Sequence, residues 1–342
     1  MRKISRRSFL SAAAVCGAAA ALTACGGSSS STAASSTASS AAASSAAADG
    51  QKYTVGICQL VEHAALDAAT QGFEDALTAQ FGENVTFDFQ NAQNDSATCA
   101  TIANGFVSAG VDLIMANATP ALQAAQAATD SIPILGTSVT EYGVALGLTD
   151  FDGTVGGNVS GTSDLAPLDQ QADMITEWLP EATKVGLLYC SAEPNSVYQV
   201  NIVREYLEGQ GLTCTDYTFS DSNDLASVTQ TACASSDVIY IPTDNTAASY
   251  ASTIHNVVVP AGVPVITGDT GTCSGCGVAV LGIDYYELGQ ITGEMAYEIL
   301  VEGADPATME VRSAPTPTKM YNPSICEELG ITPPEDYTAL ES

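Results

Sequence analysis

Tyr53-Thr54-Val55-Gly56-Ile57-Cys58-Gln59-Leu60 decides the fold, because the chain contains this kind of stretch twice. It is a near-continuous apolar run, typical of a strand that is buried on both faces, and a helical pattern follows over residues 63–81. The second half repeats both parts, with Lys184-Val185-Gly186-Leu187-Leu188-Tyr189-Cys190 ahead of a helical pattern over residues 195–209. The repetition predicts two domains built on one plan.

Further apolar runs complete the plan of each half. They cover residues 85–90, 112–118 and 132–137 in the first half, and residues 212–219, 237–241 and 263–268 in the second half. Strands that alternate with helical patterns predict a parallel sheet covered on both faces, and right-handed crossovers make each half doubly wound. The predicted fold class is therefore α/β, with two doubly wound parallel-sheet domains joined by a hinge.

The lobe boundaries follow from two features of the sequence. Residues 154–164 lie between the halves and are rich in Gly and Ser, as hinge crossings require. A helical pattern over residues 285–300 is expected to cross back and pack on the first lobe, and the Pro-rich end after Met309 to return to the second. We predict an N-terminal lobe of residues 52–160 plus 285–305 and a C-terminal lobe of residues 161–284 plus 306–342.

The first 24 residues are predicted to be a cleaved export signal, with a basic start and an apolar stretch of roughly Phe9 to Leu22. Leu22-Thr23-Ala24-Cys25 resembles a lipobox, which implies that Cys25 is lipidated. Residues 25–51 then form a flexible Ser/Ala/Gly linker behind this anchor. Residues 5–10 also resemble a twin-arginine signal, and a general secretory leader is the alternative. The predicted location is the extracytoplasmic face of the bacterial cell membrane.

The charge of the chain limits its partners. All 39 acidic residues follow the leader, where the only cationic side chains are Lys52, Lys184, Arg204, Arg312 and Lys319, so the formal charge after Cys25 is −34. Such a chain has nothing to neutralise phosphates, which excludes nucleic acid, and it is not attracted to anionic lipid. Membrane contact is expected through the lipid anchor alone.

Cysteine usage favours buried thiols over a disulfide framework. Cys58 and Cys190 lie in apolar runs, where a free thiol packs as a small hydrophobe. Cys273-Ser274-Gly275-Cys276 is a lone C-x-x-C, for which a structural loop is favoured over a redox pair, a local disulfide or half a metal site. No second C-x-x-C and no His cluster supports zinc, so we expect neither a metal nor a cofactor.

At its strand ends the chain resembles the solute-binding proteins of ABC importers, in the branch associated with tryptophan and similar amino acids. The resemblance implies the type I periplasmic-binding-protein fold, a Venus flytrap that captures ligand between its lobes and delivers it to a permease. Two departures are Ala64, where Pro is usual after the His, and Gly268, where Ser more often precedes the Asp. The matching residues are Gly56 to His63 with Ala65 to Ala68, Gln90 to Gln93, Ala118 to Ala121, Gly161 to Asp164, Pro194 to Ser196, Pro242 to Thr246 and Gly282 to Tyr286.

The residues themselves favour binding over catalysis. The sequence has two histidines and lacks the G-x-S-x-G, H-E-x-x-H and P-loop motifs, so we predict that it is not an enzyme. In doubly wound sheets the ligand lies beyond the carboxyl ends of the strands. No Arg or Lys follows a strand of the repeat, which disfavours a polyanionic ligand. Hydroxyls and helix N-termini for a carboxylate, with Asp for an ammonium, fit a zwitterionic amino acid.

The predicted ligand-binding residues follow the expected strand ends. They are Val61, Glu62, His63, Leu66, Thr119, Pro120, Ser138, Thr140, Ser163, Asp164, Ser191, Asn195, Asp244, Asn245, Asp269, Thr270 and Asp284.

Three roles are assigned among these residues. Thr119 and Ser138 would hold the ligand carboxylate, and Asp244, helped by Asn245 and Asp269, would hold the ammonium. Val61, His63 and Leu66 would contact the ligand side chain. Helix N-capping is the alternative explanation for several of them, including Thr119, Asp269 and Asp284.

The sequence therefore predicts a monomeric, lipid-anchored receptor subunit of an ABC importer. Its ligand is expected to be an amino acid, with an aromatic one such as tryptophan favoured. The alternatives are a sugar or nucleoside receptor of the same fold, a sensory lipoprotein that presents ligand to a membrane receptor, and an extracellular enzyme on the same scaffold.

Overall fold

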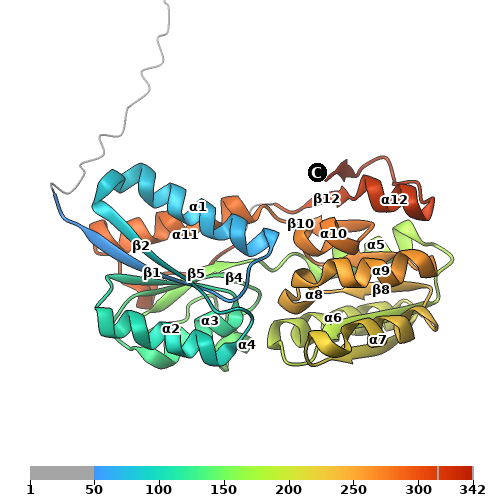
Figure 1. The fold of residues 1–342 in the computed structure, drawn as a ribbon, viewed down its shortest axis with the longest axis horizontal. Helices are drawn as coiled ribbons and strands as arrows, with labels where there is room; N and C mark the ends of the chain where they lie inside the picture. Colours follow the sequence, from blue (N-terminus) through green and yellow to red (C-terminus); the bar gives the residue numbers. More distant parts are fainter. Residues whose placement is uncertain (1–49, 314–315, 341–342) are drawn as a thin grey trace, which may run out of the picture. The chain divides into compact units, whose positions relative to one another are not determined.

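The computed structural model describes residues 50–313 and 316–340 of the chain (Figure 1). The predicted signal, the lipobox at Cys25 and nearly all of the predicted linker lie outside these residues. Among the helices described, none combines the length and the apolar character needed to cross a membrane.

The first sheet contains six strands in the order β11-β5-β4-β3-β1-β2, and all of its strand pairs are parallel. Its helices lie on both faces, with α1 and α11 on one side and α2 and α3 on the other (Figure 1). The strands are β1 (Tyr53–Gln59), β2 (Val85–Asn91), β3 (Leu113–Asn117), β4 (Ile134–Val139), β5 (Val159–Ser163) and β11 (Arg312–Ser313). The helices are α1 (Ala64–Phe81), η1 (Gly82–Asn84), α2 (Ser96–Ala109), α3 (Thr119–Ala128), α4 (Tyr142–Leu146), α11 (Tyr285–Tyr297), η2 (Glu298–Glu302) and η3 (Pro306–Thr308).

The second sheet contains seven strands in the order β13-β12-β10-β9-β8-β6-β7. Strands β6 to β10 are mutually parallel, and β12 is antiparallel to β10 at the edge. The strands are β6 (Lys184–Cys190), β7 (Thr213–Phe219), β8 (Val238–Ile241), β9 (Val265–Thr267), β10 (Ala279–Gly282), β12 (Thr318–Tyr321) and β13 (Thr338–Ala339). The helices are α5 (Leu168–Trp178), α6 (Pro194–Gly209), α7 (Ser222–Cys233), α8 (Asn245–Ser249), α9 (Ala251–Ala261), α10 (Thr270–Cys276) and α12 (Pro323–Leu329).

The apolar runs form strands because both of their faces are buried. In β1, Val55 and Ile57 pack with the helices α1 and α11, whereas Cys58 packs with α2 and α3 on the opposite face. In β6, Leu187 and Leu188 divide in the same way between two separate clusters. The prediction of two parallel α/β domains is confirmed, and each has its own hydrophobic core, so residues 50–342 contain what the folded part needs to form by itself.

Helix α11 packs closely against α1, as predicted for the segment after residue 285. A Cβ atom on Gly289 would lie 2.0 Å from the carbonyl oxygen of Ala69, and one on Gly72 would lie 2.0 Å from that of Tyr286. The two helices are therefore in backbone contact, which only glycine permits at these positions. This contact fixes the start of α11, and with it the side chain of Tyr285.

Two sheet memberships differ from the predicted lobe boundaries. Strand β5 runs across the boundary predicted at residue 160, and its whole length pairs with the first sheet. Arg312, in a segment predicted for the second lobe, pairs with Thr162 of β5. Gly and Ser in this stretch do not prevent a strand, because β4 on one side and β11 on the other supply the ladder partners.

The C-x-x-C segment is a helix and not the predicted loop. Cys273 and Cys276 lie one turn apart on α10, and both are fully buried. Asp269 caps this helix, which explains why so short a segment is helical. Cys58 and Cys190 are buried in β1 and β6, as expected for apolar thiols.

Candidate functional site

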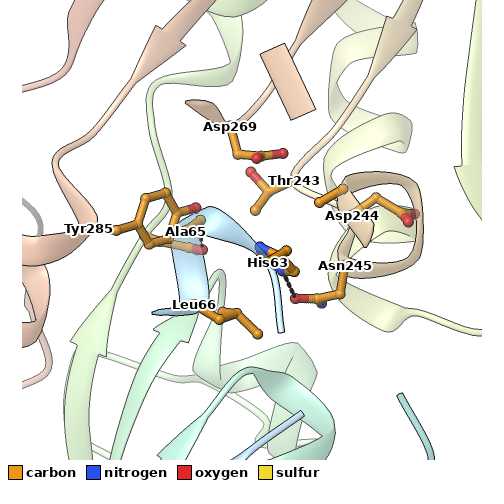
Figure 2. A pocket seen from close by; sticks show the side chains of 10 residues that line it. His63, Ala65, Leu66, Thr243, Asp244, Asn245, Asp269 and Tyr285 are labelled. Carbon is orange, nitrogen blue, oxygen red and sulfur yellow. Dashed lines mark hydrogen bonds between the residues drawn. The ribbon is translucent and has the colours of Figure 1, made fainter. Parts of the chain in front are cut away.

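A small cavity lies where the carboxyl ends of strands from both sheets meet. Its lining residues are His63, Ala65, Leu66, Asp164, Thr243, Asp244, Asn245, Ala248, Asp269 and Tyr285, which are drawn as sticks in Figure 2. The cavity measures about 10 Å³, space for roughly one water molecule. A ligand of amino-acid size therefore fits only if the two sheets move apart before it enters.

Asp164 has an uncommitted carboxylate oxygen in this cavity. The residue follows β5 directly and is 4% exposed. Its Oδ2 accepts a hydrogen bond from the Tyr285 hydroxyl at 3.0 Å, whereas Oδ1 is buried with no partner among the described residues. Burial raises the pKa of Asp164 to about 6, against the opposing effects of the Tyr285 and Thr140 hydroxyls. A buried oxygen without a donor is costly, which marks it as a position for a ligand donor.

His63 connects the two sides of the cavity. It is the residue before α1, and its Nε2 lies 3.4 Å from Asn245 Oδ1 at the start of α8 (Figure 2). The other ring nitrogen, Nδ1, is buried without a partner among the described residues. Burial raises the pKa of the neighbouring Asp269, and a positive charge on His63 would lower it.

The start of α3 can hold an anion. Its N-cap, Ala118, provides no side-chain oxygen, so the first N–H groups, including that of Thr119, lack a side-chain partner. Ser138 at the end of the neighbouring strand β4 is 7% exposed, and its Oγ is buried without a partner among the described residues. Both Ala118 (φ 89°) and Ser138 (φ 53°) have left-handed backbone conformations, which are strained for residues with a Cβ.

Asp244 lines the cavity, but its oxygens are committed to the protein. Oδ1 caps α8 through the Ala247 N–H at 2.8 Å. Oδ2 accepts from the Cys190 N–H at 2.7 Å and from the Ser196 hydroxyl at 2.8 Å. Burial, together with the charge of Glu193, raises its pKa well above the ordinary value. These contacts make Asp244 a structural cap, with little left for a ligand.

Asp269 and Thr270 begin α10. Asp269 is 2% exposed, and its two oxygens accept hydrogen bonds from the Thr272 N–H and hydroxyl, at 2.8 and 2.6 Å. Thr270 is half-buried and does not line this cavity. The capping alternative therefore accounts for the contacts of Asp269, although its side chain remains close to His63.

Three of the predicted residues are exposed and lie outside the cavity. They are Glu62, Ser191 and Asp284. The Ser191 hydroxyl donates to the carbonyl oxygen of Phe219 at 3.2 Å. Asp284 caps α11 through the Glu287 N–H at 3.0 Å, which is the capping role considered from the sequence.

The remaining predicted residues support the edges of the cleft. Leu66 is buried and lines the cavity. Val61 is half-buried and packs against the hydrophobic core that contains Leu66. Thr140 is 2% exposed, and its carbonyl oxygen accepts from the Ser163 hydroxyl at 2.8 Å. Asn195 donates from Nδ2 to the Thr243 carbonyl at 2.9 Å, and Pro120 stands in the first turn of α3. The site assignment as a whole stays a prediction.

Tyr285 and Glu193 are the important residues absent from the predicted set. Tyr285 closes the cavity and binds Asp164, and its only sequence signal is its position in the Gly282 to Tyr286 motif. Glu193 is 5% exposed and accepts four hydrogen bonds from the start of α8. Nothing in the local pattern marks this Glu, since its partners lie about fifty residues later in the chain.

Comparison with known proteins identifies the family of this chain. Residues 54–340 match the family described as ABC transporter substrate binding protein. The chain belongs to that family. It is therefore a substrate-binding protein of an ABC transporter with the type I periplasmic-binding fold, and it binds its substrate without catalysing a reaction. Residues 3–23 match the twin-arginine translocation signal, so the chain has an export signal and an extracytoplasmic location.

Individual relatives extend this result. A "Tyrosine-binding protein" of Clostridioides difficile is 39% identical over 249 residues, which is 72% of each chain. An ABC domain from Streptococcus pneumoniae, solved in complex with L-Trp, is 32% identical with a TM-score of 0.80 and covers 84% of this chain and 99% of its own. A ligand-free, open substrate-binding protein with adhesive properties from Clostridium difficile is 37% identical with a TM-score of 0.65, over 85% of this chain and 99% of its own. The structure is thus more similar to the L-Trp complex than to the open form, although the identity is lower.

Proposed function

We propose that this protein captures a zwitterionic α-amino acid, with an aromatic one such as tryptophan or tyrosine favoured, for an ABC importer. The observation that carries the proposal is the unpaired, buried Asp164 Oδ1 at the same sheet edge as the uncapped start of α3. An ammonium needs an acceptor and a carboxylate needs donors, and these two positions offer one of each.

The ammonium is assigned to Asp164 in preference to Asp244. Both are buried Asp residues at the end of a strand, but Asp244 already accepts three hydrogen bonds, whereas Asp164 accepts one. The ligand carboxylate would meet the Thr119 N–H and the Ser138 hydroxyl. Leu66 and His63 would contact the side chain of the ligand, since both line the cavity.

The charge of the site supports a zwitterion over an anion. Of the residues that line the cavity, none is Lys or Arg, and three are Asp. An anionic ligand would meet uncompensated carboxylates in a site of low dielectric. The relatives that are named for tyrosine or solved with L-Trp support an aromatic amino acid as the ligand.

In this proposal ligand favours the closed arrangement because it bridges groups from both lobes. The closed protein then delivers the amino acid to the permease, and it is held at the membrane by a lipid on Cys25 and acts as a monomer. The proposed lobes are those predicted from the sequence, with the first crossing moved to follow β5 and the last crossing moved to follow β11.

Calorimetric titration of residues 50–342 with the twenty amino acids, tryptophan and tyrosine first, tests the ligand class. We expect one-to-one binding to an aromatic amino acid, with binding weakened in Asp164→Asn. No heat with any amino acid would reject this ligand class and turn the search to sugars and nucleosides. The matched control is Asp284→Asn, which changes an exposed helix cap outside the cavity and should bind as the wild type does.

A further inference from the structure

Glu193 carries a buried carboxylate that does not line the cavity and pairs with no cation among the described residues. It follows β6 at the N-cap position of α6, yet it makes no capping bond to that helix. Apart from a long hydrogen bond that Oε2 accepts from Asn195 Nδ2 at 3.4 Å, its oxygens turn to the start of α8. Oε2 accepts from the Asn245 N–H at 3.0 Å and from Asn245 Nδ2 at 2.7 Å, and Oε1 accepts from the Thr246 N–H at 2.9 Å and hydroxyl at 2.8 Å.

These four bonds fix the direction of two side chains. Because a carboxylate only accepts, Asn245 must present its NH₂ to Glu193, which turns Oδ1 toward the first lobe. The Thr246 hydroxyl donates its only hydrogen to Glu193, so its Oγ1 can only accept a hydrogen bond from the first lobe. Glu193 thereby makes acceptors of both residues at the face of the second lobe.

The first lobe supplies a donor to each of these acceptors. His63 Nε2 lies 3.4 Å from Asn245 Oδ1, and Asn94 Nδ2 donates to Thr246 Oγ1 at 3.0 Å. Asn94 is itself held in place, since its N–H donates to the carbonyl oxygen of Leu60 at 2.8 Å. We call these two bonds between the lobes the closure contacts.

We propose that Glu193 is a positioning residue for lobe closure, which sets the donor and acceptor pattern of both closure contacts without touching the ligand. A Gln at this position has the same shape but offers one acceptor and one donor. The donor would face another donor on Asn245 or Thr246, and relief requires the amide to flip or the hydroxyl to turn. Either change places the wrong group opposite His63 or Asn94, so the closed state loses one of the two closure contacts.

The inference rests on the proposed function only in requiring that ligand binds between the lobes. Glu193→Gln, Asn94→Ala and the double variant of residues 50–342 test it by calorimetry with tryptophan or tyrosine and by small-angle X-ray scattering with and without ligand. Asn94→Ala should raise the Kd about 5-fold, as expected for one hydrogen bond. Glu193→Gln should raise the Kd about 5-fold, since it disturbs one of the two hydrogen bonds. The double variant tells which contact Glu193→Gln breaks. It should be no weaker than Glu193→Gln alone if the Thr246 hydroxyl has turned, and about 5-fold weaker if the Asn245 amide has flipped.

Scattering separates this inference from the choice of ligand. Without ligand, Glu193→Gln should have a larger radius of gyration than the wild type, whatever the ligand is. An unchanged Kd in Glu193→Gln would overturn the positioning role, and so would an unchanged radius of gyration. The matched control is Asp237→Asn, a carboxylate that accepts the Thr183 and Lys184 N–H groups at the opposite end of β6. It should lower stability and leave both the Kd and the radius of gyration unchanged.

Discussion

The two sheet edges that meet at the cavity have the same origin in the repeat but differ in how their polar groups are used. At the first edge, His63 Nδ1, Ser138 Oγ and Asp164 Oδ1 are buried without partners among the described residues. At the second edge, Asp244, Asp269 and Glu193 accept hydrogen bonds on both oxygens. Within the part of the chain that the structure describes, Asn195 Oδ1 is the one buried polar side-chain atom at this edge without a partner. In the proposed function, the first lobe keeps these unsatisfied groups for the ligand, whereas the second lobe uses its carboxylates to build the surface that closes on the ligand.

The strongest test of this comparison sets Asp164 against Asp244. Asp164→Asn should raise the Kd for the amino acid about 100-fold or more, because it removes a buried charge opposite the ammonium. Asp244→Asn should change the Kd less than about 5-fold, because its oxygens already serve the protein. Calorimetry on both variants measures the two effects. The reverse result would return the ammonium to Asp244, as first predicted from the sequence.

A second test uses the pH dependence of stability. Burial raises the pKa of Asp164 in the folded state to about 6, from an ordinary value of 3.8. The folded state therefore holds this proton more tightly than the unfolded chain, and the stability so gained is present below about pH 4 and lost as the pH rises through 6. Without ligand, the free energy of unfolding of Asp164→Asn minus that of the wild type should therefore rise by about 3 kcal/mol from pH 4 to pH 7.

Urea unfolding of wild type and Asp164→Asn at pH 4 and pH 7 measures this difference. Taking the difference between the two proteins cancels the titration of the other carboxylates. A constant difference across the two pH values would show that Asp164 is not the strained, desolvated group on which the comparison depends.

Asp244→Ala tests the structural side of the comparison. It removes the cap of α8 and leaves the Cys190 N–H and Ser196 hydroxyl without their acceptor in a buried position. The free energy of unfolding should fall by about 2–4 kcal/mol, which thermal melts can follow. An unchanged free energy of unfolding would contradict the structural role given to Asp244 in the second lobe.

The smallest expected effect concerns Ser138, which has φ 53° and an unpaired buried hydroxyl. Ser138→Gly and Ser138→Ala both delete the hydroxyl, so each should weaken binding about 10-fold. Only Gly relieves the backbone strain, so the Ser138→Gly protein should be more stable than the Ser138→Ala protein by about 1 kcal/mol. Equal binding by the wild type and both variants would show that Ser138 does not bind the ligand carboxylate. Asp164 would then be the remaining tested group of the first edge that binds ligand.

The repeat explains why so much of the fold could be predicted. Strands such as β1 and β6 are apolar on both faces, so their burial can be read locally, and the helical patterns between them require parallel crossovers. The crossing of α11 onto α1 was predictable from its place after the last strand. The C-x-x-C helix was missed because its stability comes from the Asp269 cap and from burial against neighbouring elements, and neither is visible in the four residues themselves.

The candidate site was predictable to the level of the strand end. Sequence alone determined that Asp164, Asp244 and Asp269 would lie at the carboxyl edges of two sheets, because that position follows from strand order. It also determined the family, the export signal and the absence of cationic side chains after the strands. The roles of these carboxylates were not determined, because an Asp before a helix is equally suited to a cap and to a ligand.

Only the tertiary structure decided which carboxylate is free. The partners of Asp164 and Glu193 lie 121 and about 52 residues away, at Tyr285 and Asn245, and no local pattern encodes such pairs. Whether a buried oxygen has a donor depends on which elements pack around it. A carboxylate that caps a helix and one that is left unpaired therefore differ in free energy only once the chain has folded. The sequence thus determined where the chemistry lies, and three-dimensional packing decided which of its groups are left to bind.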